Sequence, residues 1–219
     1  MKEYFKNFKN KKFWISIFCL LGLQLASYMI VKLFQSHYNT FNFDIDKKIP
    51  FVPQLIILYN LFYPVVFFAF YTVFNKDEDT YYKGVIAGII GYIIADIIFL
   101  IYPVEMIRPD ITNLNIDPIN NLILYWTYKL DTPAINCFPS MHCVFCFQSV
   151  YTMFKAKNTN KTTKSIYIIL LLSIVLTTLL VKQHYLIDII GALVIVIVCN
   201  TFVSIIKRDK WYLFFILIY

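Results

Sequence analysis

A histidine and an aspartate four residues apart, His184 and Asp188, lie between two apolar stretches near the end of the chain. If the segment from Tyr185 onward is helical, the two side chains lie on one face and within reach of each other. A carboxylate that accepts a hydrogen bond from one imidazole nitrogen leaves the lone pair of the other nitrogen free to act as a nucleophile or base. The alternative is structural, a histidine at a helix start followed by a capping aspartate, because such polar pairs often serve the fold.

Two other segments carry residue types that suit a phosphate group. Arg108 offers a permanently charged, planar guanidinium that matches phosphate geometry. Ser140 stands where an apolar helix is predicted to begin, so its hydroxyl and the free amides of the first turn can hold an anion. His142 follows two residues later and can protonate a leaving oxygen. Together with His184, these residues favour phosphoryl transfer through a phosphohistidine, with no metal required because arginine and amide donors can take the developing charge.

The composition predicts an all-α membrane protein with several spans. Of 219 residues, 59% are hydrophobic, mean hydropathy is +0.64, and the apolar residues fall in runs of the length that crosses a bilayer. The net charge of +7 does not indicate nucleic-acid binding, because the lysines lie at the ends of these runs. The five cysteines predict no disulfide framework, and the Cys143-x-x-Cys146 pair lies inside an apolar run, where a zinc site is not expected.

Hydropathy predicts six spans in a single domain, residues 1–219, as a six-transmembrane-helix bundle. The first span is read as a retained helix, because it is too long for a signal peptide. Pro64 is expected to kink the second span, residues 75–83 to form a charged hairpin, and Gly84, Gly88 and Gly91 to form a seam for close packing. Within the 103–137 loop, a short interfacial helix is expected from Asn120 to Leu130, and residues 211–219 are expected to lie in the interface. The spans are about 13–33, 51–74, 84–102, 140–154, 165–181 and 186–206.

Lysine and arginine counts predict the orientation. Fourteen lie on the side of the N-terminal tail and six on the other side, so the richer side is expected to be cytoplasmic. The sequence therefore predicts an integral plasma-membrane protein with both termini in the cytoplasm. In this orientation, Arg108, His142 and His184 all lie at the extracytoplasmic face.

Three segments of the chain resemble the motif set of the type-2 phosphatidic acid phosphatase superfamily, which is K-x6-R-P, P-S-x-H and S-R-x5-H-x3-D. In chain order, these segments are Arg108-Pro109, Pro139-Ser140-Met141-His142 and His184 to Asp188. The resemblance implies a six-helix membrane bundle with a catalytic site at its extracytoplasmic end. Two departures stand out, since the first-motif lysine is replaced by Ile101 and the third-motif Ser-Arg by Thr177 and Thr178. Lys182, or less convincingly Lys129, is expected to replace one missing cation. The sequence is also similar to the sphingolipid synthase-like branch of the superfamily. The similarity rests on the smaller number of cations and on the run His184-Tyr185 followed by Asp188 and Ala192.

The resulting hypothesis is a membrane phosphatase that hydrolyses a lipid phosphate or pyrophosphate of the phosphatidic acid or polyprenyl type. His184 attacks, Asp188 orients it, His142 protonates the leaving group, and the phosphate is held by Arg108, Ser140 and Lys182. No cofactor and no nucleic-acid partner are expected. Two roles are open for Asp96. One is to pair with one of the two cations Arg108 and Lys182, and the alternative is a hydrogen bond to the backbone of a neighbouring helix. Glu105 either orients Arg108 or is simply solvated. The alternatives are a lipid phosphotransferase of the sphingomyelin or inositol phosphorylceramide synthase type, and a non-catalytic transporter or scaffold.

Overall fold

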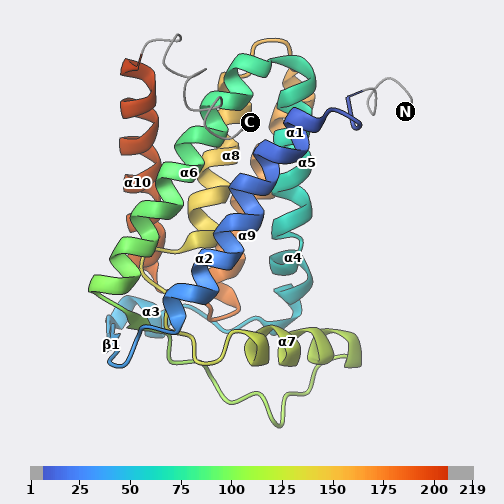
Figure 1. Cartoon of the computed structure of the whole chain (residues 1–219). Coiled ribbons are helices and arrows are strands. Elements are labelled where there is room, and N and C mark those ends of the chain that lie inside the picture. The colour runs from blue at the N-terminus through green and yellow to red at the C-terminus, as the bar shows by residue number, and fades with distance from the viewer. Residues whose placement is uncertain (1–6, 207–219) are drawn as a thin grey trace.

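The apolar stretches form long helices that run side by side in the computed structural model, which describes residues 7–206 (Figure 1). Five helical segments are long and apolar enough to cross a membrane, which confirms the prediction of an all-α polytopic membrane protein. The first segment joins α1 (Lys11–Ile17), η1 (Phe18–Gly22) and α2 (Leu23–Lys32). The second joins η2 (Pro53–Leu55), α4 (Ile56–Asn60) and α5 (Phe62–Lys76). The others are α6 (Glu78–Ile101), α9 (Lys161–Leu180) and α10 (Leu186–Ile205).

The remaining predicted span, the fourth in chain order, is α8 (Met141–Lys155), which lies in the middle of the bundle (Figure 1). It packs against α5, α6, α9 and α10, and most of its side chains are buried. Its 15 residues are shorter than the five segments around it. A helix of that length rises about 22 Å, against about 30 Å for a hydrocarbon core. Since α8 packs against four other helices and most of its side chains are buried, its length need not match the bilayer thickness.

The predicted hairpin at 75–83 was wrong. This stretch is mostly helical, and only Asp77 separates α5 from α6. Asp77 caps α6 by accepting from the Thr80 amide at 3.1 Å, and the acidic side chains in the first turn of α6 interact favourably with the positive end of the helix dipole. The break in the second segment falls at Leu61, three residues before Pro64, which agrees with the kink predicted for this proline, because its ring meets the backbone of the preceding turn.

The small-residue seam predicted on the third span packs as expected. A Cβ on Gly84 would lie 2.4 Å from the Thr152 hydroxyl oxygen of α8, and one on Gly88 would lie 2.6 Å from a methyl carbon of Leu20 in η1. The absence of side chains at these positions therefore lets α6 approach both neighbours closely.

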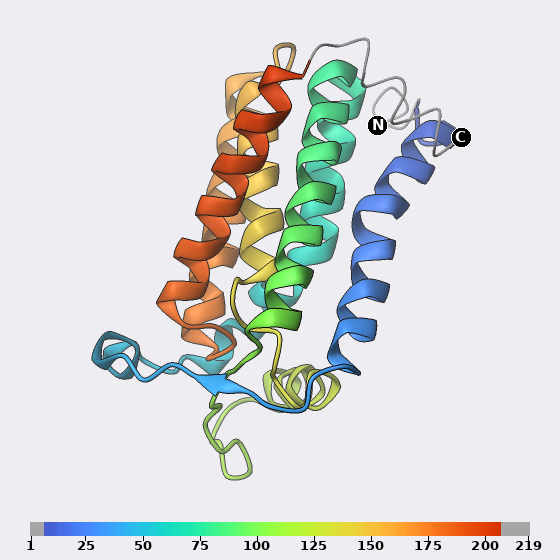
Figure 2. The same ribbon diagram turned by 60° about the vertical axis from the view of Figure 1, so that its left-hand side comes forward.

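At one end of the bundle, the connecting segments fold across the helix ends (Figures 1 and 2). α7 (Pro118–Leu130) lies across this end and contains the predicted interfacial helix. Two elements were not predicted: the short α3 (Asp44–Lys48) and a parallel pair of two-residue strands, β1 (Asn39–Thr40) and β2 (Val104–Glu105). These segments close the end of the bundle where the motif residues gather.

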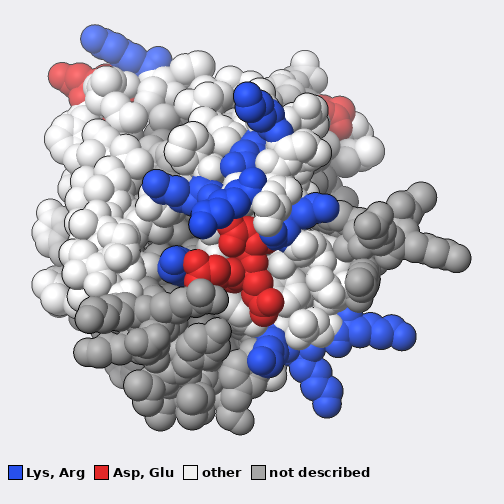
Figure 3. All heavy atoms as spheres, turned by 90° about the horizontal axis from the view of Figure 1, so that it is seen from above, with Lys and Arg blue, Asp and Glu red and all other residues white. Residues whose placement is uncertain are grey.

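Lysines crowd the opposite end, which Figure 3 views directly, and they surround a group of acidic side chains. In the described part of the chain, this end holds Lys9, Lys11, Lys12, Lys76, Lys83, Lys155, Lys157, Lys161 and Lys164. The motif end holds only Lys32, Lys47, Lys48, Arg108, Lys129 and Lys182. The predicted cations at 207–210 and the interfacial segment 211–219 lie outside the described residues.

Candidate active site

The His184 ring is oriented by two acceptors on the same nitrogen. Its Nδ1 lies 3.3 Å from Asp188 Oδ2 and 3.2 Å from the Cys137 carbonyl oxygen. Because a carbonyl and a carboxylate only accept, Nδ1 must carry the proton, and in the neutral ring Nε2 then has a free lone pair. Asp188 Oδ2 also accepts from the Tyr185 amide at 2.8 Å and so caps α10. The catalytic and the structural interpretations of this pair are therefore compatible, since the same carboxylate oxygen contacts His184 and caps α10.

The turn before His184 is a Schellman motif that closes α9. The Gln183 amide donates to the Thr178 carbonyl at 2.9 Å and the Lys182 amide to the Leu179 carbonyl at 3.1 Å. Lys182 takes the left-handed conformation, with φ of 51°, at the position that usually holds glycine. Its Nζ donates to the carbonyls of Asp46 and Ile49 at 3.0 and 2.6 Å. Lys182 thus anchors the α3 segment and lies outside the phosphate-binding cluster predicted for it.

His142 lies at the start of α8, close to His184. The two ring centroids are 5.9 Å apart. The His142 ring also packs against Tyr59 and Phe62, at centroid distances of 4.8 and 4.5 Å. No hydrogen bond to the His142 ring nitrogens is recorded among the described residues, so these nitrogens are free for a ligand.

Ser140 ties the second and third motifs together. Its side-chain oxygen caps α8 by accepting from the Cys143 amide at 3.2 Å, and its own amide donates to the Asp188 carbonyl at 3.2 Å. The close approach of α10 at this point depends on Gly191, where a Cβ would lie 2.7 Å from the Phe138 ring. The Ser140 hydroxyl proton is not needed for the cap, so it can be donated to an anion.

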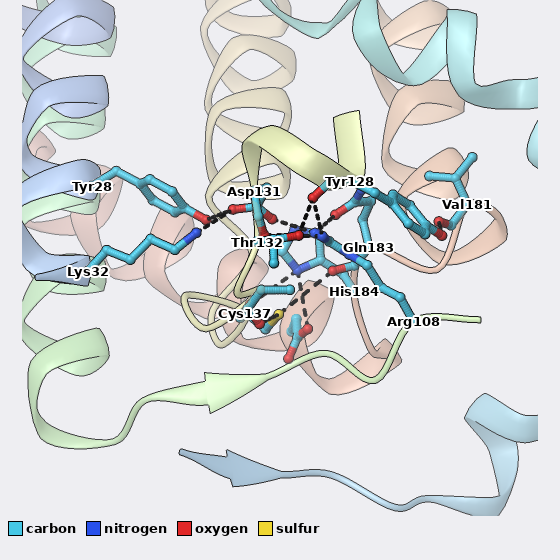
Figure 4. Close-up of polar contacts among 12 residues, drawn as sticks. Tyr28, Lys32, Arg108, Tyr128, Asp131, Thr132, Cys137, Val181, Gln183 and His184 are labelled. Carbon is cyan, nitrogen blue, oxygen red and sulfur yellow. Dashed lines mark hydrogen bonds and ion pairs between the residues drawn. The ribbon is translucent and has the colours of Figure 1, made fainter. Parts of the chain in front are cut away.

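Arg108 lies against Gln183 and Asp131 at the centre of the network in Figure 4. Its Nη1 donates to the carbonyls of Tyr128 and Asp131 at 3.2 and 3.1 Å, and its Nη2 donates to Asp131 Oδ2 and to Gln183 Oε1. The guanidinium also lies 4.6 Å from the centroid of the Tyr128 ring. Arg108 is therefore fixed in place before any ligand binds.

Asp131 links Arg108 to the first membrane segment. Its Oδ1 accepts from the Tyr28 hydroxyl at 2.7 Å and from Lys32 Nζ at 3.2 Å, both on α2 (Figure 4). Burial alone would raise the pKa of this carboxyl, but the charges of Arg108 and Lys32 and the hydrogen bonds outweigh burial and lower the pKa. Asp131 is thus a charged partner that holds Arg108 in place, the role that sequence reasoning offered to Asp96 or Glu105.

Two buried donors in this cluster have no recorded acceptor among the described residues. They are Arg108 Nε and Gln183 Nε2. The terminal nitrogens of Arg108 already use their hydrogens on four protein oxygens, so Nε–H is the donor left for a ligand. Leaving a buried donor unpaired is costly, and an anion bound here would satisfy both.

Several predicted residues lie elsewhere. The Asp96 carboxylate lies near Ser27 of α2, and no described contact joins the Glu105 side chain to Arg108. Lys129 Nζ lies over the rings of Tyr125 and Trp126 on α7. At the two positions where the motifs expect cations, Ile101 is exposed and Thr178 is buried at the end of α9, and Thr177, which replaces the motif serine, is also buried.

The comparisons with known proteins agree with this geometry. The model of the PAP2 superfamily matches residues 84–212, which is 129 of the 219 residues. The chain belongs to the PAP2 superfamily. No curated protein and no solved structure matches it. Membership in the PAP2 superfamily supports a phosphatase-type activity on lipid phosphates, and the matched segment contains all three motif regions.

Proposed function

We propose that this PAP2 protein hydrolyses a lipid phosphate monoester or pyrophosphate, of the phosphatidic acid or polyprenyl type, through a phosphohistidine on His184. The observation that carries the proposal is the pair of acceptors on His184 Nδ1, which leaves the Nε2 lone pair free, with the His142 ring 5.9 Å away. At that separation, one phosphoryl group can lie within reach of both imidazoles.

In the proposed reaction, His184 Nε2 attacks phosphorus and the bond to the leaving oxygen breaks. Protonated His142 gives its proton to that oxygen, and then takes a proton from the water that attacks the P–N bond. Asp188 stabilises the positive charge that develops on the His184 ring. Arg108 Nε–H, Gln183 Nε2–H and the Ser140 hydroxyl donate to the phosphoryl oxygens, and inorganic phosphate leaves.

A groove beside the cluster suits the rest of a lipid. It has a volume of about 810 Å³ and lies between α7 and the segment before it, lined by Ile111, Thr112, Pro118, Asn121, Leu122, Tyr125, Tyr128, Lys129 and Thr132. Tyr128 lies both in this groove and against Arg108. We assign the groove to the glycerol or prenyl portion of a membrane lipid, which places the phosphate next to Arg108.

The proposal includes an orientation in the membrane. The lysine-rich end of the bundle is assigned to the cytoplasm and the motif end to the extracytoplasmic face, in an integral plasma-membrane protein with both termini inside. The substrate would then enter from the outer leaflet.

Release of phosphate from phosphatidic acid by purified protein in detergent tests the proposal. His184→Ala and His142→Ala should each abolish release, while His37→Ala, a change at the exposed loop histidine, should preserve it. Activity should also survive EDTA, because the chemistry needs no metal. Full activity in either motif-histidine variant, or strict dependence on an added metal, would refute the mechanism.

A second candidate function is transfer of the phosphoryl-containing headgroup to a lipid alcohol. The observation in its favour is the low positive charge of the cluster. Among the described residues, Arg108 is the one cation that contacts Gln183, and its charge is already paired with Asp131. A phosphodiester carries less negative charge than a monoester and needs fewer cations. Incubation with a phosphocholine lipid and ceramide, or with labelled phosphatidic acid and diacylglycerol, separates transfer from hydrolysis by the labelled product.

A further inference from the structure

Three potential metal ligands meet directly behind the His184 ring. Cys137 Sγ, His184 Nδ1 and a carboxylate oxygen of Asp188 all lie within 4.8 Å of one another, and all three residues are buried. Thiolate, imidazole and carboxylate are the three side-chain donors that bind zinc in proteins. The Cys137 thiol has no role in the proposed hydrolysis, although the backbone carbonyl of the same residue orients His184.

A second observation points to a ligand at the same place. Asp188 is 0% exposed, and its Oδ1 has no recorded hydrogen-bond partner among the described residues. The other carboxylate oxygen is used by the Tyr185 amide and by His184 Nδ1. A buried carboxylate oxygen without a donor is unfavourable, and a cation bound there would remove that cost.

The spacing of the three groups fits tetrahedral coordination with little movement. Zinc–ligand bonds of about 2.0–2.3 Å place neighbouring ligand atoms roughly 3.4–3.6 Å apart. His184 Nδ1 and Asp188 Oδ2 are already 3.3 Å apart. Among the described residues, the Cys137 thiol has hydrogen-bonding distances to two carbonyl oxygens, of Ala134 at 3.2 Å and Gln183 at 3.8 Å, which it gives up when a metal replaces its proton.

We propose that Cys137, His184 and Asp188 form an inhibitory site for a thiophilic divalent cation of the zinc class, with water as the fourth ligand. On binding, the Cys137 thiol releases its proton to solvent and a metal–sulfur bond forms. The metal takes the Nδ1 lone pair, so the single proton of the neutral imidazole moves to Nε2. His184 then has no lone pair to attack phosphorus. The thiolate and the Asp188 carboxylate balance the two charges of the metal, so the metal-bound site is neutral overall. The inhibition rests on the proposed hydrolysis, whereas the coordination does not.

Coordination is tested on the purified full-length chain with Cd²⁺, whose thiolate complexes absorb in the ultraviolet. The wild-type chain should give a band that saturates at equimolar metal. Cys137→Ala should lose this band, while Cys199→Ala, which removes another buried cysteine of the core, should keep it. Equal bands in wild type and Cys137→Ala would overturn the proposal. If Cys137→Ala does not elute as wild type does, Cys137→Ser must also lose the band.

Inhibition is tested in the same preparations with Zn²⁺ and phosphatidic acid. Zinc should inhibit wild type reversibly, with recovery on addition of EDTA, and the concentration for half-inhibition should rise about tenfold or more in Cys137→Ala. Equal sensitivity of the two proteins would overturn the inhibitory role. If wild type releases no phosphate, the proposed hydrolysis fails, but the cadmium band still decides whether the site exists.

Discussion

The charge on Asp188 is the feature of the site whose loss can be worked through most fully. In Asp188→Asn, the amide oxygen can still accept from the Tyr185 amide and from His184 Nδ1, which keeps the cap and the tautomer. What disappears is the negative charge beside an imidazole that becomes positive during the reaction. A hydrogen bond to a charged group contributes about 1.5–3 kcal/mol, so kcat should fall about 10- to 150-fold.

Single-turnover phosphate release, together with the melting temperature in detergent, measures this effect. Asp96→Asn is the matched control, because it neutralises another buried carboxylate whose neighbour is Ser27, and its activity should stay within about twofold of wild type. Unchanged activity in Asp188→Asn would show that the reaction does not use this charge. A loss as complete as in His184→Ala would show that the asparagine does not keep the His184 tautomer, and would refute the premise that the substitution removes the charge alone.

Three other perturbations test the surroundings of the site. Gln183→Glu places a second carboxylate against Arg108, where it competes with phosphate, so KM should rise about tenfold with a smaller change in kcat; an unchanged KM would remove Gln183 from the phosphate site. Gly191→Ala puts a Cβ 2.7 Å from the Phe138 ring and should lower the free energy of unfolding by about 1–3 kcal/mol, measured by chemical or thermal unfolding in detergent. The pKa of Asp131 is lowered in the folded chain, so its carboxylate stabilises the fold above its ordinary pKa of about 3.9 and this contribution is lost as the pH falls below it. The melting temperature of wild type should therefore fall more steeply below about pH 4 than that of Asp131→Asn, and parallel curves would contradict this.

The helices could be predicted because long apolar runs leave few alternatives. The boundaries that failed lie where helices continue through polar residues, as α6 does from Glu78 to Lys83 and α9 from Lys161 to Lys164. Hydropathy does not register such turns, since capping groups and helix-dipole interactions, rather than burial, stabilise them.

The three motif segments could be expected to meet, but their neighbours could not. Asp131 and Gln183 contact Arg108 from 23 and 75 residues away, and nothing in their local sequence marks them as its partners. Lys182 looked like a phosphate ligand because it is a cation next to His184. Its left-handed backbone conformation is normally signalled by glycine, so a Schellman turn built on lysine could not be recognised beforehand.

The network around Asp131 has a practical consequence for anyone who shortens this protein. The family match starts at residue 84, yet Tyr28 and Lys32 contact Asp131, and Tyr59 and Phe62 cover the His142 ring. A fragment trimmed to the matched region would retain every motif residue and still lack one wall of the pocket. Activity assays, grafting experiments and chimeras therefore need the two segments that precede residue 84.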